Sequence, residues 1–444
     1  TACGTVTLGD SGDTFTIPAG ATINNQGTAV NFGATGSASW VTTVKTTDFT
    51  AVAGEGYFVN TTSGEIDVTL PASPSAGAVV AIKDYANTWD TNNCILLRNG
   101  SNIGGNALNS TLSIEGLAVT LVYVDATKGW LVTDSGLQNE APGPEYITAT
   151  SPCVATVGDY KIHTFTGPGT FTVCSVGNPA GSDSVDYLTV AGGGGGGSEH
   201  GGGGGAGGYR ESSGASSGCY SASPLGACVS ALPVTAQAYP IVVGGGGPGG
   251  GPGGANRGTD GSVSTFSSIT STGGGGGGTQ TASPADNREG FTGGSGGGST
   301  FGVTGAAGNT PPVSPAQGTN GGDGAPAPIS SGGGGGGATA AGIVGGIRPN
   351  GNDGGVGGAG ATSSINNTPT ARAGGGGGGP NNGGGVVPGG IGGGGAGGGD
   401  GSPQIAAIAG TVNTGGGGGG GTQSSQAGAA GGSGIVIIRY KFQN

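Results

Sequence analysis

The sequence contains little charge, few aromatic residues and no methionine. Of its 444 residues, 8% are charged and 5% are aromatic, and 24 acidic residues outnumber 12 basic ones. Nucleic acids and anionic membranes attract proteins through clusters of Lys and Arg, and the sequence has no such cluster. We therefore expect no nucleic-acid partner. We also expect no membrane insertion, because no apolar run approaches the roughly 20 residues that span a bilayer.

Residues that carry common catalytic and metal-binding chemistry are also scarce. His163 and His200 are the only histidines, and neither Cys-x-x-Cys nor His-x-x-x-His occurs. A zinc site needs about four closely spaced ligands, and the glycine-rich loops lack the Gly-Lys-Ser/Thr ending of a phosphate-binding loop. Asp84 and Asp90 resemble a carbohydrate-cleaving pair, but we interpret them as turn residues of a β surface. We predict no enzyme activity, no metal and no cofactor.

Six cysteines leave several pairings open. Two pairs are close in sequence: Cys153 with Cys174 across an expected hairpin, and Cys219 with Cys228 within one loop. Such local pairs are disulfide candidates if the protein folds in an oxidising compartment. The alternative is a set of free, buried thiols in a protein assembled inside a cell.

The first part of the chain is predicted to be all-β, because no window shows sustained helical periodicity. Short strands broken by Gly and Asp in residues 1–38 indicate a fibrous β stem or connector. Residues 39–134 alternate apolar and polar positions, as at Ile66-Asp67-Val68, and predict a compact β-sandwich-like module. Residues 135–150, which carry Pro142-Gly143-Pro144, are interpreted as a linker.

Residues 151–444 are predicted to form a glycine-rich domain. Strands are expected within 151–191, including a hairpin that turns at Gly167-Pro168-Gly169. Glycine accounts for 115 residues of the chain, and its long runs fall within residues 192–434. The apolar segment 435–444 is predicted to be a terminal strand that closes the domain by pairing with the earlier strands.

Four interpretations of the glycine runs compete. Flexible linkers are disfavoured because the chain returns to a strongly apolar terminal strand. Collagen requires glycine at every third position, and a calcium-binding β-roll requires a nine-residue repeat; neither spacing occurs. We favour a bundle of extended polyglycine-II helices with three residues per turn, joined laterally by backbone hydrogen bonds.

Two stretches resemble phage tail-fibre proteins of the marine-phage type. The first resembles a β module of such fibres and includes Thr43-Val44-Lys45-Thr46, Val68-Thr69-Leu70-Pro71 and Leu121-Val122-Tyr123-Val124 through Trp130. The second is similar to the glycine-rich C-terminal domain of phage fibres and includes Asp159-Tyr160-Lys161-Ile162-His163, Gly207-Gly208-Tyr209-Arg210 and Gly434-Ile435-Val436-Ile437-Ile438-Arg439-Tyr440. It is also similar to the polyglycine tip adhesins of T-even-like phages, which implies host binding.

The resemblance implies a structural virion fibre protein or adhesin, located on the phage tail and extracellular. The implied partners are a host cell-surface glycan or outer-membrane protein, other virion fibre or tail proteins, and further copies of the chain. The main alternative is a subunit of a homopolymeric bacterial extracellular filament, which also needs rigidity without a large core. An ice-binding protein is a third class, disfavoured because the threonines form no regular array.

Receptor-binding residues are expected in loops between glycine runs, because the runs themselves carry no side chains. The loop at 279–301 concentrates charged and aromatic residues in a half of the chain that has few of either: Asn287, Arg288, Glu289, Phe291 and Phe301. Arg348, in the loop at 347–353, is the second choice. The competing interpretation is that Arg288 and Glu289 pair on a solvated turn while Phe291 covers the end of the bundle.

Overall fold

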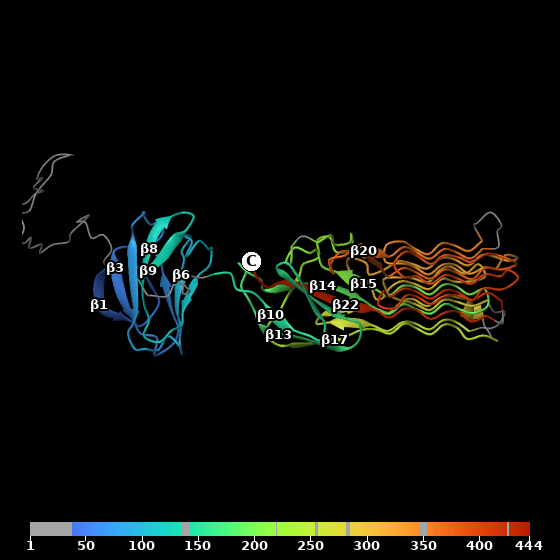
Figure 1. Cartoon of the computed structure of the whole chain (residues 1–444), viewed down its shortest axis with the longest axis horizontal. Coiled ribbons are helices and arrows are strands. Elements are labelled where there is room, and N and C mark those ends of the chain that lie inside the picture. The colour runs from blue at the N-terminus through green and yellow to red at the C-terminus, as the bar shows by residue number, and fades with distance from the viewer. Residues whose placement is uncertain are drawn as a thin grey trace, which may run out of the picture. The chain divides into compact units, whose positions relative to one another are not determined.

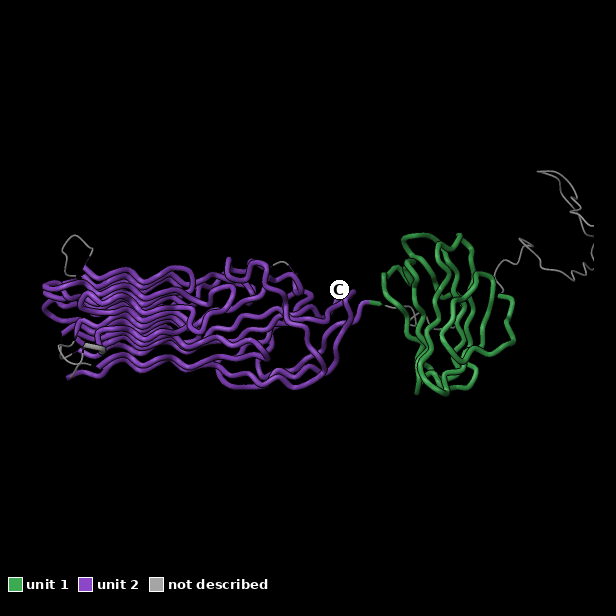
Figure 2. Tube along the Cα trace, turned by 180° about the vertical axis from the view of Figure 1, so that it is seen from behind, with its two compact units in different colours: residues 1–143 green, residues 144–444 purple. Residues whose placement is uncertain are grey.

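The computed structural model describes residues 38–134, 143–218, 220–253, 256–280, 285–346, 353–423 and 426–444. The chain forms two compact units, residues 1–143 and 144–444 (Figures 1 and 2). In the described residues the only helix is the short 3-10 helix η2 (Ala285–Arg288), which confirms the all-β class. Within these ranges no helix could cross a bilayer. The predicted stem falls outside the described residues, apart from position 38.

Unit 1 consists of two sheets. The larger sheet has the order β1-β3-β5-β8-β9 and comprises β1 (Ser39–Lys45), β3 (Glu55–Val59), β5 (Val79–Asp84), β8 (Ala118–Asp125) and β9 (Gly129–Asp134). The smaller sheet comprises β2 (Phe49–Thr50), β4 (Ile66–Thr69), β6 (Cys94–Leu97) and β7 (Ser110–Leu112). In each sheet the first three strands are parallel and the remaining pairs are antiparallel.

One hydrophobic cluster lies between these two sheets. Ile66 and Val68 of β4 are buried in it while Asp67 between them is half-buried, as the alternation predicts. Trp89 and Trp130 fill the cluster and are fully buried. Asp84 is not a surface turn residue as interpreted: it ends β5 and is buried. Its carboxylate accepts hydrogen bonds from the backbone amides of Thr88, Trp89 and Gly116, and so holds the turn that follows the strand.

Unit 2 begins with two further sheets. One has the order β11-β12-β22-β14-β15 and comprises β11 (Val154–Val157), β12 (Tyr160–Phe165), β22 (Ile435–Lys441), β14 (Ser184–Val190) and β15 (Tyr209–Glu211), with β16 (Leu232–Pro233) beside β14. The other comprises β10 (Thr148–Thr150), β13 (Gly169–Ser175), β17 (Ala238–Val242), β18 (Ser264–Phe266) and β19 (Ile269–Ser271). A separate hairpin joins β20 (Ala361–Ser363) to β21 (Thr370–Arg372). β10 lies at the end of the segment interpreted as a linker.

The terminal strand β22 occupies the middle of its sheet. It pairs antiparallel with β12 on one side and with β14 on the other, so the predicted docking of this strand is confirmed. Its side chains alternate between two hydrophobic clusters: Val436, Ile438 and Tyr440 enter one, whereas Ile435 and Ile437 enter the other. Since both faces are buried, the strand reads as a continuous apolar run.

The expected hairpin between residues 160–166 and 170–173 is wrong. Both strands form at these positions, but β12 and β13 lie in different sheets. The two edges of β12 are occupied by β11 and β22, and β13 pairs with β10 and β17 instead. The chain therefore turns a corner at Gly167-Pro168-Gly169 rather than folding back on itself.

The placement of β12 and β13 in different sheets also bears on the predicted cysteine pairs. Cys153 and Cys174 belong to segments of different sheets, and both are free and exposed, so the Cys153–Cys174 pairing is not present in the structure. Cys228 is also a free, exposed thiol, while Cys219 lies outside the described residues and its pairing stays a prediction. Cys94 is buried, and burial raises the pKa of its thiol.

Beyond the sheets, unit 2 consists of extended glycine-rich runs that lie side by side (Figures 1 and 2). In the run at 191–198, successive amides donate to three different neighbours, and each neighbour recurs after three residues. Gly192 and Gly195 donate to the run at 256–262, Gly193 and Gly196 to the run at 426–434, and Gly194 and Gly197 to the run at 201–208. The carbonyls of 192–197 accept, with the same period, from the runs at 272–280, 244–251 and 414–422. One run thus bonds six others.

This close packing explains why the runs are glycine. A Cβ on Gly194 would lie 2.3 Å from the carbonyl oxygen of Gly275, and one on Gly204 would lie 2.1 Å from that of Gly194. Ordering a residue costs about 1–2 kcal/mol of backbone entropy, and glycine loses more freedom than other residues. A buried amide left unpaired would add about 1–3 kcal/mol to that cost. The bundle therefore depends on pairing almost every interior amide.

We expect Gly194→Ala to destabilise unit 2 by on the order of 3 kcal/mol, because its Cβ has no space between the runs. The matched control is Gly245→Ala, where nothing lies within 4 Å of an added Cβ. This control should change stability by less than about 1 kcal/mol. Denaturant unfolding of the purified variants measures both effects. Equal stability of the two variants would contradict the packing described above.

Candidate functional site

The glycine-rich runs separate the two ends of unit 2. The strands and the C-terminus lie at one end, and turns between runs form the opposite end, which we call the outer end (Figure 1). Turns distant in sequence meet there. The amide of Gln280 donates to the carbonyl of Glu199 (3.1 Å), and the side-chain amide of Asn381 donates to the carbonyl of Ile329 (2.5 Å). Loops from along the whole domain thus form one surface.

Two arginine–aromatic pairs lie at or near the outer end. The guanidinium carbon of Arg288 is 4.2 Å from the ring centroid of Phe301, and that of Arg257 is 3.5 Å from the ring centroid of Phe291. Cation–π contacts at exposed sites contribute about 0.5–1 kcal/mol each. Phe291 keeps 37% of its surface exposed, and Glu289 beside it is exposed. The loop therefore presents a charged and aromatic surface whose arginines are held in place.

The structure brings together most of the predicted receptor-binding residues. Asn287 ends η2 together with Arg288, and its carbonyl accepts a hydrogen bond from the amide of Thr279. Phe301 occupies a tight turn with a φ of 55° and reaches Arg288 from the next pair of runs. Arg288 also stacks on Phe301, and the competing interpretation of an Arg288–Glu289 pair on a solvated turn stays a prediction.

The second predicted loop has its ends at the same place. Arg348 lies outside the described residues, as do residues 347–352. The flanking residues Gly346 and Asp353 are joined by a 2.8 Å backbone hydrogen bond, and the Asp353 carbonyl also accepts from the Ser331 hydroxyl. Both candidate loops therefore start and finish at the outer end of the same bundle.

Sequence reasoning missed Arg257. This residue belongs to a different turn from Phe291, and only the packing of the runs brings the two together. A signal was nevertheless present: Asn256-Arg257 repeats the dipeptide Asn287-Arg288, and each pair opens a run that returns from the outer end.

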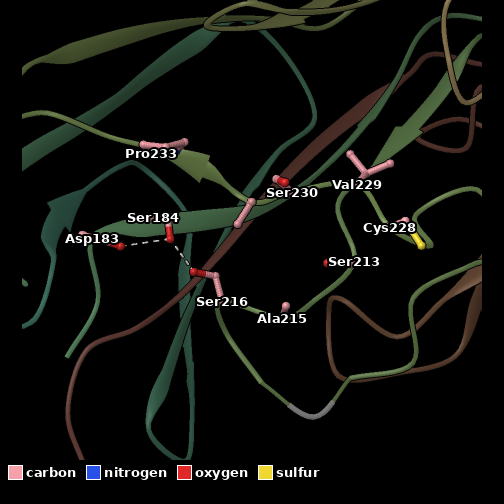
Figure 3. A pocket seen from close by; sticks show the side chains of 10 residues that line it. Asp183, Ser184, Ser213, Ala215, Ser216, Cys228, Val229, Ser230 and Pro233 are labelled. Carbon is pink, nitrogen blue, oxygen red and sulfur yellow. Dashed lines mark hydrogen bonds between the residues drawn. The ribbon is translucent and has the colours of Figure 1, made fainter. Parts of the chain in front are cut away.

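A hollow that is open to solvent lies at the strand end of unit 2 (Figure 3). It has a volume of about 450 Å³, and its lining includes Asp183, Ser184, Ser216, Cys228 and Val229. The Ser184 hydroxyl hydrogen-bonds the Asp183 carboxylate (3.2 Å) and the Ser216 hydroxyl (2.5 Å). The residues that line the hollow include no histidine or lysine to activate a hydroxyl or thiol nucleophile.

Buried carboxylates near this hollow have a structural role. Asp186 accepts hydrogen bonds from the Ser212 hydroxyl (2.6 Å), the Gly214 amide (3.1 Å) and both donors of Ser217 (2.6 and 2.7 Å). In the same way, Glu211 accepts from the hydroxyl of Tyr209 (2.9 Å). Burial and the Glu211 charge raise the pKa of Tyr209, which keeps its hydroxyl a donor. These bonds hold the 212–217 loop against β14.

Both histidines use ring nitrogens in hydrogen bonds within the chain. Nδ1 of His163 is 2.7 Å from the Ser151 hydroxyl, and Nε2 is 3.2 Å from the Tyr440 hydroxyl. Burial, with a smaller contribution from Lys161, lowers the pKa of His163 from 6.5 to about 4. A group with so low a pKa is a weak base at neutral pH. His200 lies at the outer end, where its Nδ1 is 2.7 Å from the Pro380 carbonyl.

The chain matches one known family over more than half of its length. Residues 165–441 fit the glycine-rich domain family. The chain belongs to this family. The matched region begins at the end of β12 and finishes with β22, so it includes the runs, their turns and the strands that close the glycine-rich domain. No curated protein matches the chain.

We expect the stability of the glycine-rich domain to fall as the pH is lowered from 6.5 to 4. In this window the unfolded chain binds a proton at His163 that the folded chain does not bind, which costs up to about 3 kcal/mol at pH 4. His163→Gln should be less stable at neutral pH but should lose less stability on acidification. Denaturant midpoints between pH 4 and 7 measure this difference, with His200→Gln as the control. Identical pH profiles for wild type and His163→Gln would refute the assignment.

Proposed function

We propose that the runs of the glycine-rich domain are polyglycine-II helices. Helices of this kind have three residues per turn, a rise of about 3.1 Å per residue and no internal hydrogen bonds. The supporting observation is the three-residue period with which one run changes its hydrogen-bond partners, together with its six neighbours. An extended helix of three residues per turn directs successive amides about 120° apart, so each third amide meets the same neighbour.

We further propose that the chain is a structural fibre protein or adhesin of a phage tail, and that it binds the host cell surface through the outer end. The observation that carries this proposal is the gathering of charged and aromatic loop residues at or near the outer end, where Arg288 pairs with Phe301 and Arg257 with Phe291. A stiff bundle holds these loops away from the sheets. The resemblance to tail-fibre sequences supports the same assignment.

The chemistry of the outer end suits a glycan or an outer-membrane protein loop. Guanidinium groups bind carboxylate and phosphate groups in bidentate geometry, and aromatic faces contribute apolar contact area. The interior runs offer a ligand only backbone that is already paired. Specificity therefore resides in the turns, where sequence can change without altering the bundle. This role needs neither catalysis nor a cofactor.

We expect slow amide exchange in the interior runs, because nearly every interior amide is paired. Peptides that cover 192–197 should exchange far more slowly than those that cover 244–249, where Gly245 is exposed. Hydrogen-exchange mass spectrometry of the intact chain measures this difference. Rapid exchange over both segments, as in a flexible glycine linker, would count against polyglycine-II helices.

We expect the combined substitution Arg288→Ala and Phe291→Ala to reduce adsorption of the purified, labelled chain to host cells by about tenfold or more. The reason is that it removes one guanidinium group of the outer end and the exposed aromatic ring of Phe291 on the adjoining run. Tyr85→Ala is the matched control, since it removes an aromatic ring with 56% exposure from unit 1. Undiminished adsorption of the double variant, with unfolding unchanged, would remove this loop from the receptor-binding surface.

A further inference from the structure

Exposed aliphatic side chains gather along one edge of the glycine bundle. Ile405, Ile408 and Val412 of the run at 404–412 are 50%, 56% and 67% exposed. Val386 of a neighbouring run is 38% exposed and lies next to Ile405: a Cβ at Gly399 would be 3.2 Å from a methyl group of Val386 and 3.4 Å from the Cβ of Ile405. Leaving several large aliphatic side chains in water on one face indicates an interaction surface.

The backbone of this edge run bonds three neighbouring runs and has open groups on its remaining side. The Ile408 carbonyl accepts from the amide of Gly419, and the amide of Gly410 donates to the carbonyl of Ala430. The amides of Ile405, Ile408 and Thr411 donate to Gly399, Ala396 and Gly393, so the run pairs antiparallel with its neighbour at every third residue. On the exposed side, the N–H and C=O groups of Ala406 and Ala409 bond no other backbone group within the described part of the chain. Ile405 and Ile408 are thus three residues apart, as are the open backbone groups of Ala406 and Ala409.

Another edge of the bundle is built differently. In the run at 244–251, Gly244, Gly247 and Gly250 are buried, while Gly245, Pro248 and Gly251 face solvent. Proline has no N–H, so position 248 presents no donor to a further run. This edge also lacks exposed aliphatic side chains over those positions. It is therefore protected against lateral pairing in the way that natural sheet edges are, whereas the edge at 404–412 is not.

Charge also distinguishes the edge at 404–412. The formal net charge of the chain is −12, so two copies repel each other over most of their surfaces. Between Arg372 and Arg439 the sequence contains a single charged residue, Asp400. Its carboxylate accepts from the amide of Gly383 (3.2 Å) and from the side chain of Gln404 (3.4 Å). Two copies can approach most closely where this neutral segment faces outward.

We propose that the run at 404–412 binds the same run of a second copy of this chain across a twofold axis. An antiparallel partner with a three-residue period matches both the aliphatic side chains and the open backbone groups, and a second copy supplies such a run. The twofold axis places Ile405 of one copy beside Ile408 of the other. The pairing repeats, between two molecules, the antiparallel contact that this run already makes with the run at 392–400.

Analytical ultracentrifugation of the intact chain over a range of concentrations tests the proposal. Wild type should dimerise reversibly, and the combined change Ile405→Ser and Ile408→Ser should raise the dimer Kd by about a hundredfold. Ala406→Asp should have a similar effect, because it brings a negative charge from each copy close to the axis and changes only an exposed position. Ile343→Ser, at a 42% exposed isoleucine on another run, is the matched control and should leave Kd unchanged.

Three outcomes would overturn the proposal. The first is a wild-type chain that stays monomeric at its highest soluble concentration. Binding of such a monomer to phosphatidylcholine vesicles through this edge would assign the edge to a lipid surface instead. The second is a dimer that persists in both edge variants. The third is open-ended polymers in electron micrographs of the wild type, because a twofold contact closes on itself. That last result would instead favour the extracellular filament.

Discussion

The backbone hydrogen bond between neighbouring glycine runs is the interaction on which the rest of unit 2 depends. An interior run has no apolar side chains to bury, so its ordering must be offset by pairing amides and carbonyls with adjacent runs. Each pairing requires that the backbones approach to hydrogen-bond distance, and this approach leaves no space for a Cβ, as at Gly194 and Gly204. Close approach and lateral bonding therefore require each other. A single interior side chain disturbs several runs at once.

Hydrophobic packing is concentrated at the other end of the domain. Two clusters of buried side chains share β22, whose alternate residues enter opposite clusters. Because the last strand pairs between β12 and β14, residues from both ends of the domain meet in one sheet. The strands thus fix where the first and last runs begin. This division of labour places the apolar core at one end and leaves the turns of the outer end under weaker packing constraints.

The positions of the strands could be predicted from the sequence better than the strands or runs with which each one pairs. Alternation at Ile66 and Val68 and the apolar run at 435–441 correspond to strands in the structure, because burial of side chains sets both patterns. Turn residues at 167–169 indicated a change of direction but not the sheet that the chain would join next. Adjacency among runs was beyond prediction, since glycine carries no side chain that could encode a neighbour. For the same reason the contact between Arg257 and Phe291 could not be derived. The concentration of charged and aromatic residues in the 279–301 loop, in contrast, could be read from the sequence.

At the surface of the glycine bundle the outermost runs have no further run to bond, and non-glycine residues take up some of their backbone groups. At its margins side-chain oxygens replace the carbonyls of a missing run: Asp260 accepts from the amide of Gly276, Asp323 from Gly305 and Asn320 from Gly308. Burial raises the pKa of Asp260, and the hydrogen bond from the Gly276 amide and the charge of Arg257 oppose that rise. Proline at position 248 ends the lattice by removing a donor. Beside Ala406 and Ala409 the run carries neither a proline nor an acidic or amide side chain, and the exposed side chains there are aliphatic. The run at 404–412 is therefore left uncapped while the other margins named here are capped. Its open backbone groups recur every three residues, which is the spacing at which a run of a second copy could bond.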